Sequence, residues 1–113
     1  MSALTTHVLD TARGLPAKGV PVLLEAHSGN GNWIKLAEGK TDSDGRVKEL
    51  LPAKAPLSAG RYRLTFDTGV YAKAIGESCF FPSVTIIFET KETAHLHVPL
   101  LLSPYGYSTY RGS

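Results

Sequence analysis

The sequence predicts an all-β protein, an antiparallel β-sandwich of two sheets with one short helix. Apolar residues recur at every second position, turn residues separate these runs at short intervals, and a single stretch departs from the alternation. The chain has 113 residues, and a domain of this size buries roughly 65% of the surface that its unfolded chain exposes. We therefore expect residues 1–113 to form a single domain around one core.

Four runs show the alternation most clearly, and they cover residues 20–26, 33–38, 61–67 and 84–90. In the third run the apolar set is Tyr62, Leu64 and Phe66, and the residues between them are polar or charged. A strand with one buried and one solvated face is typical of a sheet that packs on a second sheet. Together with shorter runs elsewhere in the chain, these patterns predict about seven or eight strands.

Turn residues separate the runs, most clearly at positions 14–16, 28–31 and 42–45. The pair Asp44 and Gly45 suits a turn position that needs a positive φ angle. Residues 51–60 contain two prolines and a final glycine, and this composition predicts a loop.

The stretch from residue 68 to residue 76 breaks the alternation. Ala72 and Ala74 favour a helix, and Gly76 is typical of the position that follows a helix end. A helix this short is stable only when it packs on the sheets. We expect one helix here.

Composition excludes several classes of function. The net charge is +2 without a run of Lys or Arg, so nucleic acid is not an expected partner. The apolar runs are too short to span a membrane, and the N-terminal residues do not resemble a secretion signal, so we expect a cytoplasmic protein. The single cysteine, Cys79, lies beside Phe80 and Phe81, which favours a buried small hydrophobe over a nucleophile.

Histidines are the first candidates for chemistry, and the chain has four of them. His95 and His97 lie two positions apart on an expected strand, so they point to the same face, and Pro99 predicts an edge position or a break soon after them. This pair is compatible with a metal site, but the sequence lacks the other ligands of a closed site, and we expect no metal. His7 is expected to face outward beside a buried Val8, and His27 lies next to a turn and is expected to be structural.

Arg46 and the C-terminal residues are the other candidates. Arg46 follows a turn, where its guanidinium is suited to an anionic or carbonyl-rich ligand, although the pattern by itself favours a solvated arginine. The last nine residues include three tyrosines and Arg111. This composition is unusual for a frayed end and predicts that the tail docks against a surface or pairs as an edge strand.

Several of these stretches resemble the motifs of one family, the 5-hydroxyisourate hydrolases, which are transthyretin-like proteins. Residues 95–104 read HLHVPLLLSP and residues 107–113 read YSTYRGS, and together they resemble the signature of that family. Residues 6–10, 14–17 and 41–46 resemble its first strand, first turn and third motif. The resemblance therefore covers essentially the whole chain, and its most specific part is the terminal Tyr-Arg-Gly-Ser.

The resemblance implies both a reaction and an assembly. The reaction is the hydrolysis of 5-hydroxyisourate to 2-oxo-4-hydroxy-4-carboxy-5-ureidoimidazoline in urate degradation, by water attack that opens the six-membered ring, without a cofactor. The assembly is a homotetramer, a dimer of dimers with its active sites between the dimers. The implied fold is a transthyretin-like sandwich.

The resemblance also implies roles for individual residues. His7 and His97 are expected to activate water and to transfer protons, and which of them is the general base stays open. Arg46 is expected to orient the substrate and to stabilise charge on the carbonyl oxygen. The substrate-binding residues are Tyr110, Arg111 and Gly112, and Ser113 contributes its hydroxyl or its terminal carboxylate.

Two other functions are compatible with a sandwich of this size. One is a non-enzymatic carrier of a small aromatic ligand, as in transthyretin, and the other is an adhesion module. A carrier favours an apolar channel, whereas His7, Arg46 and His97 make a polar and reactive one. An adhesion module is expected to carry a secretion signal, so the hydrolase is the favoured interpretation.

Overall fold

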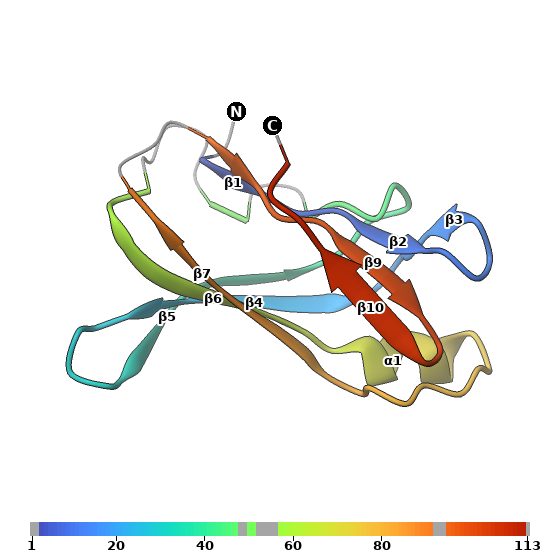
Figure 1. Ribbon diagram of the computed structural model, residues 1–113. Coiled ribbons are helices and arrows are strands. Elements are labelled where there is room, and N and C mark those ends of the chain that lie inside the picture. The colour runs from blue at the N-terminus through green and yellow to red at the C-terminus, as the bar shows by residue number, and fades with distance from the viewer. Residues whose placement is uncertain (1–2, 48–49, 52–56, 92–94, 113) are drawn as a thin grey trace.

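Two four-stranded sheets pack against each other, which confirms the predicted sandwich (Figure 1). The computed structural model describes residues 3–47, 50–51, 57–91 and 95–112. Within these residues the strands are β1 (Leu4–Thr5), β2 (Val8–Asp10), β3 (Leu15–Pro16), β4 (Pro21–His27), β5 (Trp33–Lys40), β6 (Gly60–Phe66), β7 (Val84–Thr90), β8 (Leu96–His97), β9 (Leu100–Ser103) and β10 (Gly106–Thr109). The helix is α1 (Thr68–Ala74). Part of the expected loop at 51–60 lies outside the described residues.

The first sheet has the order β5-β4-β6-β7 and is antiparallel throughout. Its strands are the four runs in which the alternation was clearest. The register between β4 and β5 shifts between Leu24 and Glu25, so that Ala37 lies opposite Leu24 and Ile34 lies opposite Ala26. An irregularity of this kind changes which residues of β5 share a face, and the simple alternation of 33–38 did not predict it.

The second sheet has the order β10-β9-β2-β3 and contains a parallel pair, β2 with β9. β1 and β8 also pair in parallel. The sequence predicted antiparallel neighbours, because hairpin turns set the direction of strands that follow one another. No hairpin joins β2 to β9, which lie far apart in the chain, so local pattern could not give their direction.

The core lies between the sheets and consists of the apolar positions that alternate along the strands. Its least exposed side chains include Val8, Val22, Leu24, Leu64, Phe66 and Leu100. The buried set at Tyr62, Leu64 and Phe66 is the one that the alternation predicted. Burial of a side chain of this size stabilises the fold by roughly 1.5–3 kcal/mol.

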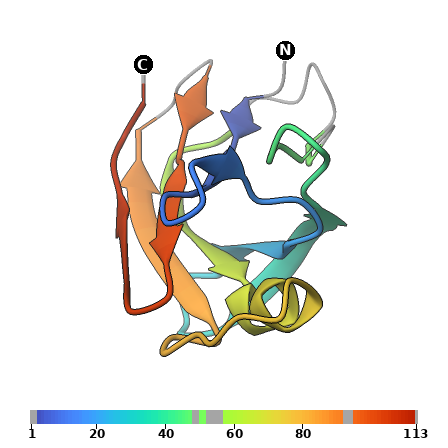
Figure 2. The same cartoon turned by 90° about the vertical axis from the view of Figure 1, so that its right-hand side faces the viewer.

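The helix α1 forms where the sequence predicted it. The Asp67 side chain accepts a hydrogen bond from the Val70 amide at 3.2 Å, and Gly76 follows the helix end with φ at 71°. The Tyr71 hydroxyl donates to Asp10 Oδ2 at 2.7 Å, which ties the helix to β2. α1 lies at one end of the sandwich, whereas the N- and C-terminal segments lie at the other end (Figure 2).

The expectation of a buried Cys79 was wrong, because this residue is half-buried. The chain leaves the helix along the surface, and the Cys79 thiol donates to the Phe81 carbonyl at 3.3 Å. The neighbouring Phe80 is 68% exposed, so the apolar character of this stretch does not place it in the core. No helix among the described residues is long and apolar enough to cross a membrane.

Replacing Leu64 by alanine should lower the free energy of unfolding by about 2–5 kcal/mol, because the residue is fully buried and leaves a cavity. The matched control is Ile34→Ala, since Ile34 is 55% exposed and should cost less than about 1 kcal/mol. Urea denaturation followed by circular dichroism measures both variants. Equal losses in the two variants would contradict the assignment of the core.

Candidate active site

The segments that carry His7 and His97 run side by side in parallel. The amides of Leu96, Val98 and Leu100 donate to the carbonyls of Ala3, Thr5 and His7 at 2.7, 2.9 and 2.8 Å. Thr6, Val8, Leu96 and Val98 are buried. The residues between them, Thr5, His7, His95 and His97, are half-buried, so their side chains point to the outer face. This confirms that His95 and His97 share a face opposite the core, and it places His7 on that face as well.

A tight turn brings Arg46 beside His7. Asp42 Oδ1 accepts hydrogen bonds from the amides of Asp44 and Arg46 at 2.8 and 3.1 Å, and Gly45 has φ at 76°. The Gly45 carbonyl accepts from the Val8 amide at 2.8 Å, and Arg46 forms an antiparallel bridge with His7. Residues paired in this way carry their side chains on the same face of the sheet.

The turn also fixes the ring of His7. His7 Nε2 donates a hydrogen bond to the Asp44 carbonyl, with 2.7 Å between the two atoms. Because a carbonyl oxygen only accepts, Nε2 carries the proton and Nδ1 of the neutral ring carries the lone pair. Gly45 allows this approach, since a Cβ at that position would lie 3.2 Å from His7 Cδ2 and 2.4 Å from the Val8 carbonyl.

The C-terminal segment crosses His97 from the other side. The Gly112 amide donates to the His97 carbonyl at 2.7 Å, in an antiparallel bridge. The Gly112 backbone lies so close to the imidazole that a Cβ would come within 2.5 Å of His97 Cδ2. We call the set His7, Arg46, His97 and Gly112 the histidine face.

The surroundings of His97 lower the pKa of its imidazole below the ordinary value. Partial burial of the imidazole is the largest cause, and the positive charges of Arg46, His7 and His95 add to it. The Thr5 backbone acts in the opposite direction. The lowered pKa favours the neutral imidazole, which is the form that accepts a proton from water.

Thr5 is a neighbour of His97 that sequence reasoning missed. Thr5 Oγ1 and His97 Nδ1 share a hydrogen bond of 2.8 Å, and the two residues are register partners in the β1–β8 pair. A signal was available in the sequence, because Thr5 lies two positions before His7 and therefore shares its face. What the sequence lacked was the pairing of that strand with residues 96–97.

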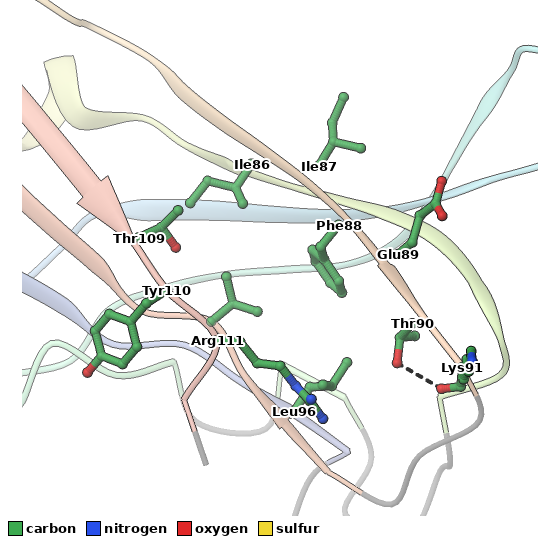
Figure 3. A pocket seen from close by; sticks show the side chains of 11 residues that line it. Ile86, Ile87, Phe88, Glu89, Thr90, Lys91, Leu96, Thr109, Tyr110 and Arg111 are labelled. Atoms are coloured by element: carbon green, nitrogen blue, oxygen red, sulfur yellow. Dashed lines mark hydrogen bonds between the residues drawn. The ribbon is translucent and has the colours of Figure 1, made fainter.

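The other tail residues occupy a neighbouring cavity. Tyr110 and Arg111 help to line a cavity of about 580 Å³ beside β7 (Figure 3). Arg111 extends toward Leu96, while Tyr110 lies on the opposite side of the tail (Figure 3). Of the three expected substrate-binding residues, Gly112 alone is bridged to His97 in the described part of the chain. Ser113 lies outside the described residues.

The histidine face combines groups suited to hydrolysis. Two imidazoles can exchange protons with water, and a guanidinium can stabilise negative charge on an oxygen. Among the residues that the structure describes, no group of three or more His, Cys, Asp or Glu side chains is placed to share a metal ion.

Comparison with known proteins gives consistent matches over nearly the whole chain. The 5-hydroxyisourate hydrolase of Salmonella typhimurium is 50% identical over 111 residues, which cover 97% of this chain and 80% of the relative. The structure of Klebsiella pneumoniae 5-hydroxyisourate hydrolase has a TM-score of 0.83 at 40% identity, covering 99% of this chain and 100% of that one. Sea bream transthyretin in complex with thyroxine has a TM-score of 0.90 at 30% identity, covering 97% and 94%.

These structures confirm the predicted transthyretin-like sandwich with one short helix. The family model described as HIUase/Transthyretin matches residues 4–112, a range that includes every described member of the histidine face. The chain belongs to the HIUase/Transthyretin family.

Proposed function

We propose that this chain is a cyclic amidohydrolase that hydrolyses 5-hydroxyisourate in urate degradation. The observation that carries the proposal is the histidine face, in which the backbone brings His7, Arg46 and His97 together on one surface. A relative that carries the name of this activity is 50% identical over nearly the full chain. The product is 2-oxo-4-hydroxy-4-carboxy-5-ureidoimidazoline, and the proposal includes no cofactor and no metal.

His97 is the general base in this proposal. Its lowered pKa favours the neutral imidazole, and the ring takes a proton from water while the water oxygen attacks the C6 carbonyl carbon. The C6–N1 bond then breaks, and the protonated imidazole returns a proton to the departing nitrogen. His7 lies on the same face, where its Nε2 donates to the Asp44 carbonyl, and it orients the water or the substrate.

Arg46 stabilises the negative charge that develops on the carbonyl oxygen. Its side chain is exposed on the histidine face, so the guanidinium is accessible to a bound substrate. Loss of one such donor typically costs ~10²–10³-fold in kcat. Tyr110, Arg111 and Gly112 line the substrate site in the assembled enzyme, and the Ser113 hydroxyl or terminal carboxylate contacts the attacking water.

A homotetramer, built as a dimer of dimers with sites between the dimers, is part of the proposal. What supports it is the position of the histidine face on the outside of the sheet, where Arg46 is exposed in a single chain. Exclusion of bulk water strengthens the electrostatic stabilisation that Arg46 gives a bound substrate, and in this proposal a neighbouring subunit supplies the cover. The proposed location is the cytoplasm, and neither nucleic acid nor a membrane is a proposed partner.

A carrier of a small aromatic ligand is the second candidate. The specific observation in its favour is the TM-score of 0.90 with a transthyretin that holds thyroxine. Ligand pockets of carriers are mostly apolar, whereas the histidine face presents two imidazoles and a guanidinium. This difference favours the hydrolase.

Replacing His97 by alanine should lower kcat/KM by about 10²–10⁴-fold, because a positioned general base contributes that much. The assay follows the ultraviolet absorbance of freshly generated 5-hydroxyisourate, with a sample without enzyme to measure the spontaneous decay. His27→Ala is the matched control, since His27 lies on β4 and contacts Trp33 at a ring distance of 4.9 Å. Full activity in a folded His97→Ala variant would exclude His97 as the base, and inactivity of the wild type would favour the carrier.

The pKa of His97 should rise when Arg46 is replaced by glutamine, because one of the positive charges that lower it is removed. It should remain below the ordinary value of 6.5, since burial is the larger cause. As the pH falls, the variant should therefore lose the neutral form of His97 at a higher pH than the wild type does. Proton NMR titration of the His97 ring without substrate measures the shift, with Arg61→Gln as the control, because Arg61 bonds Glu89 on the first sheet. An unchanged or lower pKa would contradict the coupling.

Gly112→Ala should abolish most of the activity without unfolding the chain, because its Cβ would overlap the His97 ring. The matched control is Gly106→Ala, whose Cβ would lie 3.7 Å from Ser103 Oγ, an ordinary contact distance. Both variants are compared by kcat/KM and by thermal melting. If Gly112→Ala is as active as Gly106→Ala, the close approach of the tail to His97 has no role in catalysis.

A further inference from the structure

We propose that Thr5 is a positioning residue that holds the His97 imidazole with its proton on Nδ1, so that Nε2 is available to accept a proton from water. This role rests on the proposed function, because it concerns the base of the same reaction. Thr5 contacts the base and not the substrate, and it acts through His97.

The contact itself is short and direct. Thr5 Oγ1 lies 2.8 Å from His97 Nδ1, within the range of a good hydrogen bond. The two residues are paired in the β1–β8 register, so their side chains leave the backbone on the same face. Both are half-buried, and bulk water therefore competes less for this hydrogen bond than at an open surface.

The backbone around Thr5 prevents the contact from shifting. The Ala3 and Thr5 carbonyls accept from the amides of Leu96 and Val98, so both sides of the pair are hydrogen-bonded. The buried Thr6 side chain adds a further tie, since its hydroxyl donates to the Val98 carbonyl at 2.6 Å. A β-branched residue such as threonine also has few χ1 rotamers, which restricts the position of the Thr5 hydroxyl.

The His97 ring is held on both of its edges. Thr5 contacts Nδ1, and the Gly112 backbone lies against Cδ2 on the other edge. A flip of the ring would exchange these two edges and bring Cδ2 against the Thr5 hydroxyl. In this orientation Thr5 binds Nδ1, so Nε2 is the ring nitrogen that faces neither the Thr5 hydroxyl nor its strand, and it is the nitrogen that we assign to the reaction.

The two histidines are bound through opposite nitrogens. His7 Nε2 donates to the Asp44 carbonyl, whereas His97 is bound at Nδ1. The partner of one ring nitrogen determines which nitrogen carries the proton of a neutral imidazole. When the Thr5 oxygen accepts from Nδ1–H, the lone pair of His97 lies on Nε2, and this difference distinguishes the base from its neighbour.

The test compares Thr5→Val with Thr5→Ser. Valine keeps the shape and the β-branching but lacks the hydroxyl, and serine restores it. Thr11→Val is the matched control, because Thr11 Oγ1 donates to the Leu102 carbonyl at 3.1 Å and its removal deletes an equivalent bond away from His97. For each variant, nitrogen-15 NMR of the histidine rings determines the tautomer of His97, and 5-hydroxyisourate decay gives kcat and KM.

The wild type and Thr5→Ser should show His97 with the proton on Nδ1, and Thr5→Val should lose this preference. In Thr5→Val, kcat should fall about 10-fold, which is part of the ~10²–10⁴-fold that a positioned base contributes. KM should change little, because in this proposal Thr5 does not bind the substrate. Thr11→Val should match the wild type in both measurements.

A Thr5→Val variant with unchanged His97 nitrogen shifts and unchanged kcat would overturn the proposal. So would a wild-type ring with its proton on Nε2. If the wild type does not hydrolyse 5-hydroxyisourate at all, the proposed function fails, yet the NMR comparison still tests whether Thr5 sets the tautomer. Thermal melting of Thr5→Ser and Thr5→Val separates a loss of structure from a loss of positioning.

Discussion

The parallel pairing between the N-terminal segment and residues 96–100 is the constraint on which the rest of the site depends. Its hydrogen bonds run from the Ala3 carbonyl to the Leu100 amide without a break across the junctions β1–β2 and β8–β9. The same pairing buries one side of both segments and exposes the other. It therefore contributes to the core and aligns His7 with His97, so that a loss of register would disturb stability and chemistry together.

Close approach of backbone to imidazole is the second recurring feature. A Cβ at Gly112 would come within 2.5 Å of His97 Cδ2. A Cβ at Gly45 would come within 3.2 Å of His7 Cδ2 and, more severely, within 2.4 Å of the Val8 carbonyl oxygen. Each glycine thus lets a neighbouring segment restrict an imidazole by contact as well as by hydrogen bonding. The chemistry of the histidine face depends on this confinement, because a base contributes most when its orientation is set before the substrate binds.

The sequence predicted most of the fold, because alternation and turn residues are local signals. The buried set of β6 and the helix that ends before Gly76 follow directly from neighbouring residues. Three features depend on non-local packing and could not be predicted from the local pattern. They are the parallel direction of β2 and β9, the register shift between β4 and β5, and the exposure of Cys79. The shared face of His95 and His97 followed from local spacing. The family resemblance implied that Arg46 and His7 serve one reaction, but not that they pair as a bridge. Thr5 was missed because the strand that pairs with it was unknown.

The C-terminal segment contacts two surfaces of the molecule at once. Arg111 reaches into the cavity beside β7, while the next residue, Gly112, is bonded to the His97 backbone. Arg111 and Gly112, which are adjacent in the chain, thus hold the C-terminal segment against two different surfaces. A molecule that binds in this cavity would therefore contact the residue next to the one that is bonded to His97, which places the edge of the first sheet within one residue of the proposed base.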